Sequence, residues 1–268
     1  MIRYSNTTEE IPQPRPVFCW RFRDELPAVL SIMTLTILVE LGSFIMGRFY
    51  GSSFGNSLLA ALGVSVLWCV IAPGSVSVGG RGLMSTFVRG GVIADTTAIS
   101  MLVLWIVGCG EPGGIDFLGV VKIYCICVPL VLTSVGCVAI AKSPVGRSVA
   151  VLIAVSVLFV TLASPLLINP WIVNGGSHTE TLGAWAVRIN PFFAVCDAVV
   201  VQTGFIWRQG ELMYEWSQLG ETVIPPPIEW YQTALLYAGV ALTLWVVALI
   251  RTFCCCRRKG NALCRRHG

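Results

Sequence analysis

The stretch LPAVLSIMTLTILVELGSFIM, residues 26–46, contains a single charged side chain, Glu40. A helix that crosses the hydrocarbon core of a bilayer needs about 20 apolar residues, so this stretch predicts a transmembrane helix. The whole chain is 55% hydrophobic and 12% charged, and that charged share is about half of the 25% typical of soluble domains. We therefore expect an integral membrane protein.

Five further stretches along the chain have the length and apolarity of a membrane span. They cover residues 54–72, 92–107, 117–141, 148–168 and 230–250, and the stretch 92–107 is short unless it begins near Phe87. The sequence thus predicts an all-α, polytopic bundle of six transmembrane helices. Residues 26–168 are expected to hold the first five spans, and residues 230–250 the sixth.

Arginine and lysine gather in alternate segments between the predicted spans. They occur in residues 1–25, in the second-to-third and fourth-to-fifth connections, and in residues 251–268, whereas residues 169–229 hold two arginines against six acids. Connections rich in basic residues stay on the cytoplasmic side. We therefore expect both termini in the cytoplasm and residues 169–229 outside it.

The connection at 169–229 is too long for a structureless loop. It contains the apolar stretch RINPFFAVCDAVVVQ, residues 188–202, and several Trp and Tyr residues, which favour the headgroup level of a membrane. We expect one or two helices that lie at the outer interface or dip into it. Pro191 would begin the second helix, because proline suits a first helical turn.

Ionisable side chains inside spans are functional candidates. Lys122, one turn into the fourth span, can extend its amine to the headgroups, and Asp95 is expected near the beginning of the third span, where a helix N-terminus favours it. Glu40 lies too deep to reach water. It should face the bundle or a wet cavity and find a partner there, as a structural hydrogen bond or as part of a transport path.

Short catalytic motifs are absent from the sequence. It has no phosphate-binding loop, no zinc-hydrolase helix and no nucleophile elbow, so we expect no enzymatic activity, no cofactor and no ATP site in this chain. His178 and Glu180 are too few for a zinc site. We also expect no nucleic-acid partner, because the basic residues follow membrane topology.

The C-terminal tail is rich in cysteine and basic residues, including Cys254, Cys255, Cys256, Cys264 and His267. We interpret it as a reduced cytoplasmic tail that contacts anionic lipid. Acylation of the cysteines and a metal site are the alternatives.

The six-span layout and the segment LGAWAVRINPFFAVCDAVV, residues 182–200, together resemble the membrane subunit of type-2 ABC exporters. In that family an interface helix precedes the first span, and short re-entrant helices precede the last, often with Asn-Pro and an aromatic residue. The resemblance implies an interface segment at 1–25. It also implies an outer gate formed by Asn190, Pro191, Phe192, Phe193 and Asp197.

The resemblance further implies a contact with a separate ATPase between spans two and three. That place reads SVGGRGLMSTFVRGG, residues 77–91, where Arg81, Thr86 and Arg89 are the coupling candidates and the glutamate common in the family is absent. The implied function is a permease subunit that exports a hydrophobic or lipid-like substrate by alternating access. Its partners would be membrane lipids, the ATPase and a second copy or a similar permease, with Glu40 as a polar residue of the path.

Two other functions fit the sequence. A non-catalytic membrane subunit or scaffold of a larger complex explains the lack of catalytic motifs. A membrane-embedded enzyme or ion-coupled carrier would need clustered polar side chains that face one another, for which Glu40, Asp95 and Lys122 are too few. We expect the protein to reside in the bacterial inner membrane.

Overall fold

The computed structural model describes residues 22–77, 83–109, 111, 114–141, 143–173, 179–199 and 229–264. Nine helices make up most of these residues: α1 (Phe22–Phe49), α2 (Phe54–Ser77), α3 (Leu83–Val107), α4 (Phe117–Ile140), α5 (Pro144–Leu162), α6 (Ser164–Val173), α7 (Thr179–Ile189), α8 (Pro191–Ala198) and α11 (Trp230–Cys264). Six of the described helices, α1 to α5 and α11, are long and apolar enough to cross a membrane. The predicted all-α, six-span bundle is confirmed.

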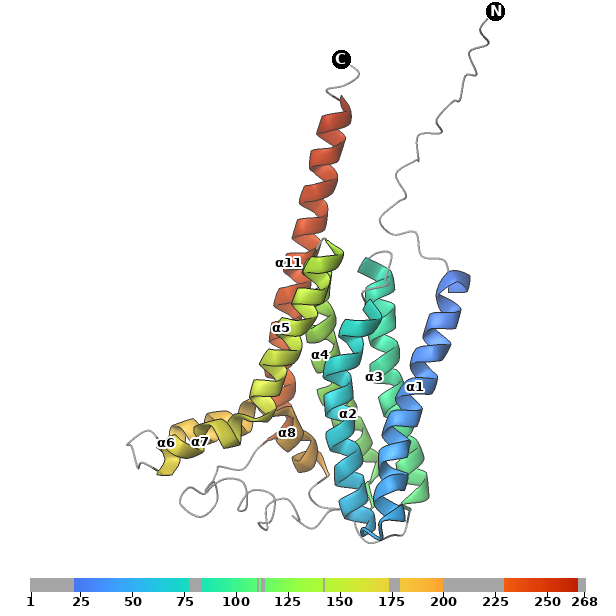
Figure 1. Cartoon of the computed structure of the whole chain (residues 1–268), viewed down its shortest axis with the longest axis vertical. Helices are drawn as coiled ribbons and strands as arrows, with labels where there is room; N and C mark the ends of the chain where they lie inside the picture. The colour runs from blue at the N-terminus through green and yellow to red at the C-terminus, as the bar shows by residue number, and fades with distance from the viewer. Residues whose placement is uncertain are drawn as a thin grey trace, which may run out of the picture.

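Helix α4 lies at the centre of the bundle (Figure 1). It packs against α2, α3, α5, α8 and α11, and its Leu130 and Val131 side chains are fully buried. The first residue of α1 and the last residue of α11 lie at the same end of the bundle (Figure 1), as an even number of spans requires. The apolar residues of α4 that face its neighbours therefore form the core, and the outer faces of α1, α5 and α11 are left for lipid.

The turn between α1 and α2 depends on two glycines. Gly51 has φ +78°, a backbone conformation that glycine adopts without the strain other residues meet. A Cβ atom at Gly47 would come within 2.9 Å of the Ser57 hydroxyl, so the two helices approach closely just before the turn. Beside it, the Phe44 and Phe54 rings meet edge to face with centroids 5.0 Å apart.

The helices of the first, second and sixth spans extend beyond their predicted ends, and those of the third and fifth spans also begin at other residues. Helix α3 begins at Leu83 instead of residue 92, because the Arg89 charge that broke the apolar pattern is neutralised by Glu25 of α1. Helix α5 begins at Pro144, where the Ser143 side chain caps it, and ends at Leu162 instead of residue 168. The remaining apolar residues of that predicted span form the first part of α6.

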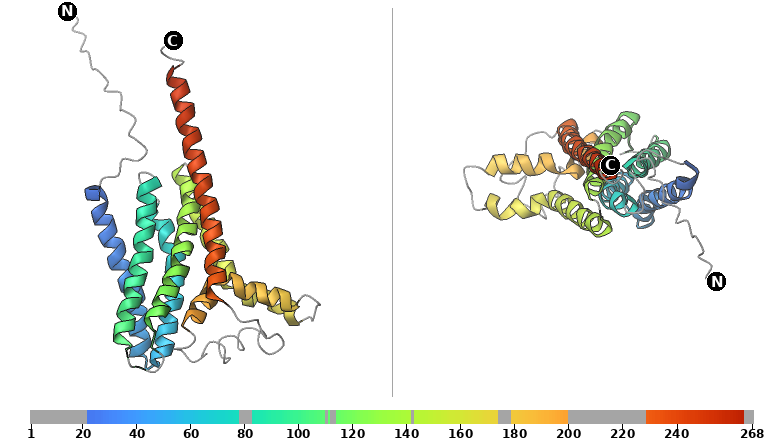
Figure 2. Two further views of the ribbon diagram at one scale, coloured as in Figure 1. Left: turned by 180° about the vertical axis from the view of Figure 1, so that it is seen from behind. Right: turned by 90° about the horizontal axis from the view of Figure 1, so that it is seen from above.

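Helices α6 and α7 form a hairpin that leaves the bundle sideways (Figure 2). Helix α8 then folds back beneath the bundle, where it packs against α2, α4 and α11. The expectation of one or two short helices between spans five and six was too low, since the described residues contain three. Residues 200–228 of this connection lie outside the described residues.

Candidate functional site

The break between α7 and α8 lies at Asn190-Pro191, where a helix start was predicted. The Asn190 side-chain oxygen accepts a hydrogen bond from the Phe192 amide at 3.0 Å and so caps α8, and Pro191, which has no N–H to satisfy, occupies the first turn. The Asn190 side-chain amide donates to the Leu162 carbonyl at 3.0 Å. Asn190 is 1% exposed, so one buried side chain bonds one backbone group at the beginning of α8 and one at the end of α5.

The end of α7 is also fully satisfied. The last four carbonyls of a helix have no partner within it, and here each one accepts a hydrogen bond from elsewhere. The Ser164 hydroxyl donates to the Ala186 carbonyl at 2.9 Å, and the Asn190 backbone N–H donates to the Val187 carbonyl at 3.3 Å. The Thr233 hydroxyl donates to the Arg188 carbonyl at 2.7 Å, and the Tyr237 hydroxyl to the Ile189 carbonyl at 2.9 Å. A broken helix is tolerated in a membrane only where its backbone is satisfied in this way.

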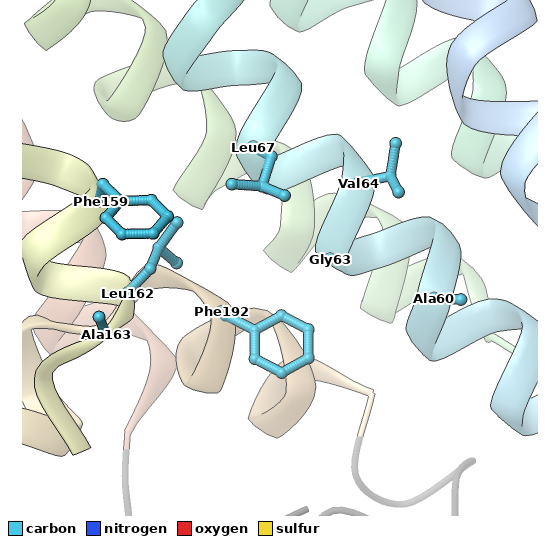
Figure 3. A pocket seen from close by; sticks show the side chains of 8 residues that line it. All are labelled: Ala60, Gly63, Val64, Leu67, Phe159, Leu162, Ala163 and Phe192. Atoms are coloured by element: carbon cyan, nitrogen blue, oxygen red, sulfur yellow. The ribbon is translucent and has the colours of Figure 1, made fainter. Parts of the chain in front are cut away.

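An apolar groove of about 380 Å³ lies against this broken helix (Figure 3). It runs between α2 and α5, and Phe192 of α8 forms its floor. All eight lining residues are apolar: Ala60, Gly63, Val64, Leu67, Phe159, Leu162, Ala163 and Phe192. Phe159 is 64% exposed at the rim, so the groove opens to the side of the bundle, where lipid tails lie.

The other predicted gate residues lie around this floor but do not line the groove. Pro191 and Phe193 are buried within α8, and Asp197 is half-buried in its last turn. The neighbouring Cys196 is fully buried. Of the five predicted gate residues, Phe192 is the one whose side chain meets the groove.

A second site surrounds Glu40 in the middle of the bundle. Glu40 is fully buried, as predicted, and its Oε1 accepts a hydrogen bond from the Thr97 hydroxyl of α3 at 2.7 Å. Ser65 of α2 and Ser100 of α3 face the same carboxyl group. Both serine hydroxyls are close enough to act on the carboxyl group, but neither they nor Glu40 Oε2 makes a hydrogen bond of good geometry.

Sequence reasoning missed the polar neighbours of Glu40. Thr97 and Ser100 are three residues apart on α3, and Ser65 and Cys69 are four apart on α2, spacings that put each pair on one helix face. That periodicity was the available signal. The Cys69 sulfur lies 3.8 Å from the Thr97 hydroxyl, so this thiol belongs to the polar cluster and is more than a small apolar filler.

The other two charged residues in spans lie apart from Glu40. Asp95 was expected at the beginning of the third span, but because α3 begins at Leu83 it lies near the middle of that helix. Its side chain is exposed on the outer face of the bundle and accepts a hydrogen bond from the Tyr124 hydroxyl at 2.8 Å. Lys122 lies in the second turn of α4 and is half-buried.

Two of the three predicted coupling residues, Thr86 and Arg89, lie at the end of the bundle where α1 and α3 begin. Arg89 is held by Glu25, with its Nε and second guanidinium nitrogen 2.7 and 2.6 Å from Glu25 Oε2, and the Ser85 hydroxyl donates to Glu25 Oε1 at 2.8 Å. Thr86 is buried beside them. Arg81 lies outside the described residues.

Replacing Arg89 by alanine is expected to destabilise the protein by about 1–2 kcal/mol. The two side chains of the pair are 14% and 10% exposed, so removal of Arg89 leaves a largely buried carboxylate, at a cost that residual water reduces below the value for a fully buried pair. Thermal unfolding in detergent measures the loss. Replacing Arg48, which is exposed and bonds the Ser52 carbonyl of its own turn, is the control and should change stability by less than about 0.5 kcal/mol.

Comparison with protein-family models, with curated proteins and with solved structures gave no match. The candidate function therefore rests on the residues and their geometry. His178, His267 and the side chains of Cys255, Cys256 and Cys264 lie outside the described part of the chain. The interpretations of the tail, like the expectation of no metal and no cofactor, stay predictions.

Proposed function

We propose that the protein is the permease subunit of an ABC-type exporter that moves a hydrophobic or lipid-like substrate, powered by a separate ATPase. The observation that carries the proposal is the broken helix α7–α8, whose buried, capped ends lie directly beneath an apolar groove. Helices interrupted within the membrane are typical of transporters, which place substrate sites beside the break. A passive scaffold has no need of an interrupted helix whose freed backbone groups require partners.

The groove supports a lipid-like substrate through its size and lining. Its volume of about 380 Å³ falls within the range of small-molecule sites, about 300–1,000 Å³. An apolar chain gains free energy wherever it leaves water, but inside a bilayer the groove offers no such gain over lipid. Selection of the substrate would therefore depend on shape and on contact with the Phe192 ring, and the polar headgroup would stay at the outer end.

In an alternating-access cycle, α8 would move together with α5. The α7–α8 junction is bonded to α5 through Asn190 and to α11 through Thr233 and Tyr237. A displacement of α5 relative to α2 would therefore carry Phe192 with it and change the width of the groove. ATP binding to the partner would drive that displacement from the opposite end, through Thr86 and the segment that contains Arg81.

Purification of the tagged chain from native membranes in mild detergent tests the proposal. We expect a stoichiometric ATPase subunit with its own phosphate-binding loop, whose ATP turnover in nanodiscs rises when native lipid extract is added. Thr86→Val together with Arg81→Ala should abolish that rise while the subunit stays bound. The matched control is Thr243→Val, a surface threonine of α11 that bonds its own helix.

Recovery of a large complex without an ATPase would replace the exporter proposal with the scaffold function. Recovery of the chain alone, as a monomer or dimer, would overturn the ATPase partnership. The same preparation reports whether two copies, or one copy and a similar permease, form the functional unit. We also propose residence in the bacterial inner membrane, which fractionation of the host membranes tests.

A further inference from the structure

The carboxyl group of Glu40 combines complete burial with incomplete hydrogen bonding. It is 0% exposed, and it lies nine residues before the end of α1, about 14 Å along the helix axis. Thr97 satisfies Oε1, while Oε2 has no hydrogen-bond partner. An ionised carboxylate in this position is very costly unless a cation neutralises it.

The groups around Glu40 are oxygen atoms with unused bonding capacity. The hydroxyls of Ser65 and Ser100, which are 1% and 0% exposed, face the carboxyl group but make no hydrogen bond of good geometry. A hydroxyl can donate one hydrogen bond and accept others. Three buried oxygens with unused bonding capacity therefore surround one carboxyl group, and a cation bound among them would satisfy all three.

We propose that Glu40, Ser65, Thr97 and Ser100 bind one monovalent cation, a proton or a sodium ion, between α1, α2 and α3. A proton on the carboxyl group removes its charge and supplies an O–H donor to a serine oxygen. A sodium ion would be held by carboxylate and hydroxyl oxygens, the ligands that hard cations prefer. The site binds without any ATPase, so it is independent of the exporter function.

Few other ionisable groups act on this site. On α2, the Cys69 thiol faces Glu40, and Cys127 of α4 lies behind it. On α3, Asp95 is exposed on the outer face of the bundle and Arg89 is paired with Glu25 of α1, while Arg48 lies in the last turn of α1. Occupancy of the site is therefore set by the carboxyl group and its three hydroxyls.

Dicyclohexylcarbodiimide labelling of the purified full-length chain in nanodiscs tests the proposal. The O–H of a neutral carboxyl group adds across one N=C bond of the reagent, and the adduct rearranges to a stable N-acylurea that retains all its atoms. Peptide mass spectrometry then gives the yield at Glu40. We expect the yield to fall as pH rises, with a single midpoint, and Glu40→Gln to lose the adduct completely.

Labelling in two salts distinguishes a sodium site from a site that binds only protons. If sodium binds, replacing potassium by sodium at constant ionic strength lowers the yield several-fold; if the site takes only protons, the yields are equal in both salts. The Ser65→Ala/Ser100→Ala variant should lose the sodium effect or move the midpoint by about one pH unit, a tenfold change in proton affinity. Ser134→Ala is the control, because that buried hydroxyl bonds a carbonyl of its own helix.

Melting temperature provides a second readout that does not require the reagent to reach the site. The melting temperature of the wild type should change with pH or with sodium, and that of Glu40→Gln should not. If Glu40→Gln does not fold, the Ser65→Ala/Ser100→Ala variant replaces it in this comparison. Parallel responses of wild type and variant, with a labelling yield that is flat in pH and sodium, would overturn the proposal. Loss of the ATPase partner would leave all of these results unchanged.

Discussion

Replacing Asn190 by alanine is expected to destabilise the protein by about 2–4 kcal/mol and to lower its melting temperature by on the order of 10 °C. The substitution removes the cap of α8, which costs about 0.5–2 kcal/mol. It also leaves the Leu162 carbonyl without its side-chain donor, and an unsatisfied buried group costs about 1–3 kcal/mol. Thermal unfolding in detergent, followed by tryptophan fluorescence, measures the change.

Two further substitutions show where the loss comes from. Asn190→Ser keeps a neutral oxygen that can cap α8 but is too short to donate to the Leu162 carbonyl, so it should recover part of the stability. Asn56→Ala removes an exposed asparagine at the beginning of α2 and should have an effect below about 0.5 kcal/mol. If Asn190→Ala melts with the wild type, the break between α7 and α8 does not depend on this side chain.

Replacing Gly63 by leucine is expected to lower substrate-stimulated ATP turnover by about tenfold or more. A Cβ atom at Gly63 would lie 3.3 Å from the Phe192 ring, so the leucine side chain fills the groove and presses on its floor. Overpacking of this kind costs about 1–3 kcal/mol, and about 1.4 kcal/mol already corresponds to a tenfold loss of binding. The measurement is ATP turnover of the permease–ATPase complex against the concentration of added lipid.

Gly239→Leu is the matched control, because no atom lies within 4 Å of a Cβ atom at that position of α11. Both substitutions replace a helix glycine, so both raise helix propensity by about 1 kcal/mol. A difference between the two variants therefore reports on the groove and not on the helix. Full activity of Gly63→Leu would remove the groove from the substrate path.

The apolar pattern predicted the spans because burial in lipid depends on local composition. The beginnings of α2, α4 and α11 agree with the sequence analysis. The beginning of α3 does not, since the Arg89 charge is neutralised by Glu25, 64 residues away along the chain. Pairing between distant helices is a tertiary property, so a window of sequence cannot report it.

The Asn-Pro break is a second feature that a local stretch of sequence could not predict, because it depends on contacts between helices. Ile-Asn-Pro followed by an aromatic residue occurs twice, at 168–171 and at 189–192. The first copy continues through α6 with Pro170 inside the helix, whereas the second separates α7 from α8. Around the second copy, Leu162, Thr233 and Tyr237 provide partners for the freed backbone and for Asn190, and these partners come from other helices.

The Glu40 site was predicted only in part for a related reason. A lone carboxyl group in an apolar run is visible in sequence, and its burial followed from its depth. The convergence of Ser65, Thr97 and Ser100 on that carboxyl group depends on the rotation of α2 and α3 about their axes. Serine and threonine are common in membrane helices, so their presence alone did not single out these three.

The hydrogen bonds at the end of α7 also bear on the order in which the helices enter the membrane. The Arg188 and Ile189 carbonyls are satisfied by Thr233 and Tyr237 of α11, which the ribosome makes after α7. Until α11 has entered the bilayer, those carbonyls lack these two partners, so we expect the α6–α7 hairpin to reach its final position only after α11 is in place. A chain truncated before residue 230 would retain five spans and leave this hairpin unfinished, exposed to the proteases of membrane quality control.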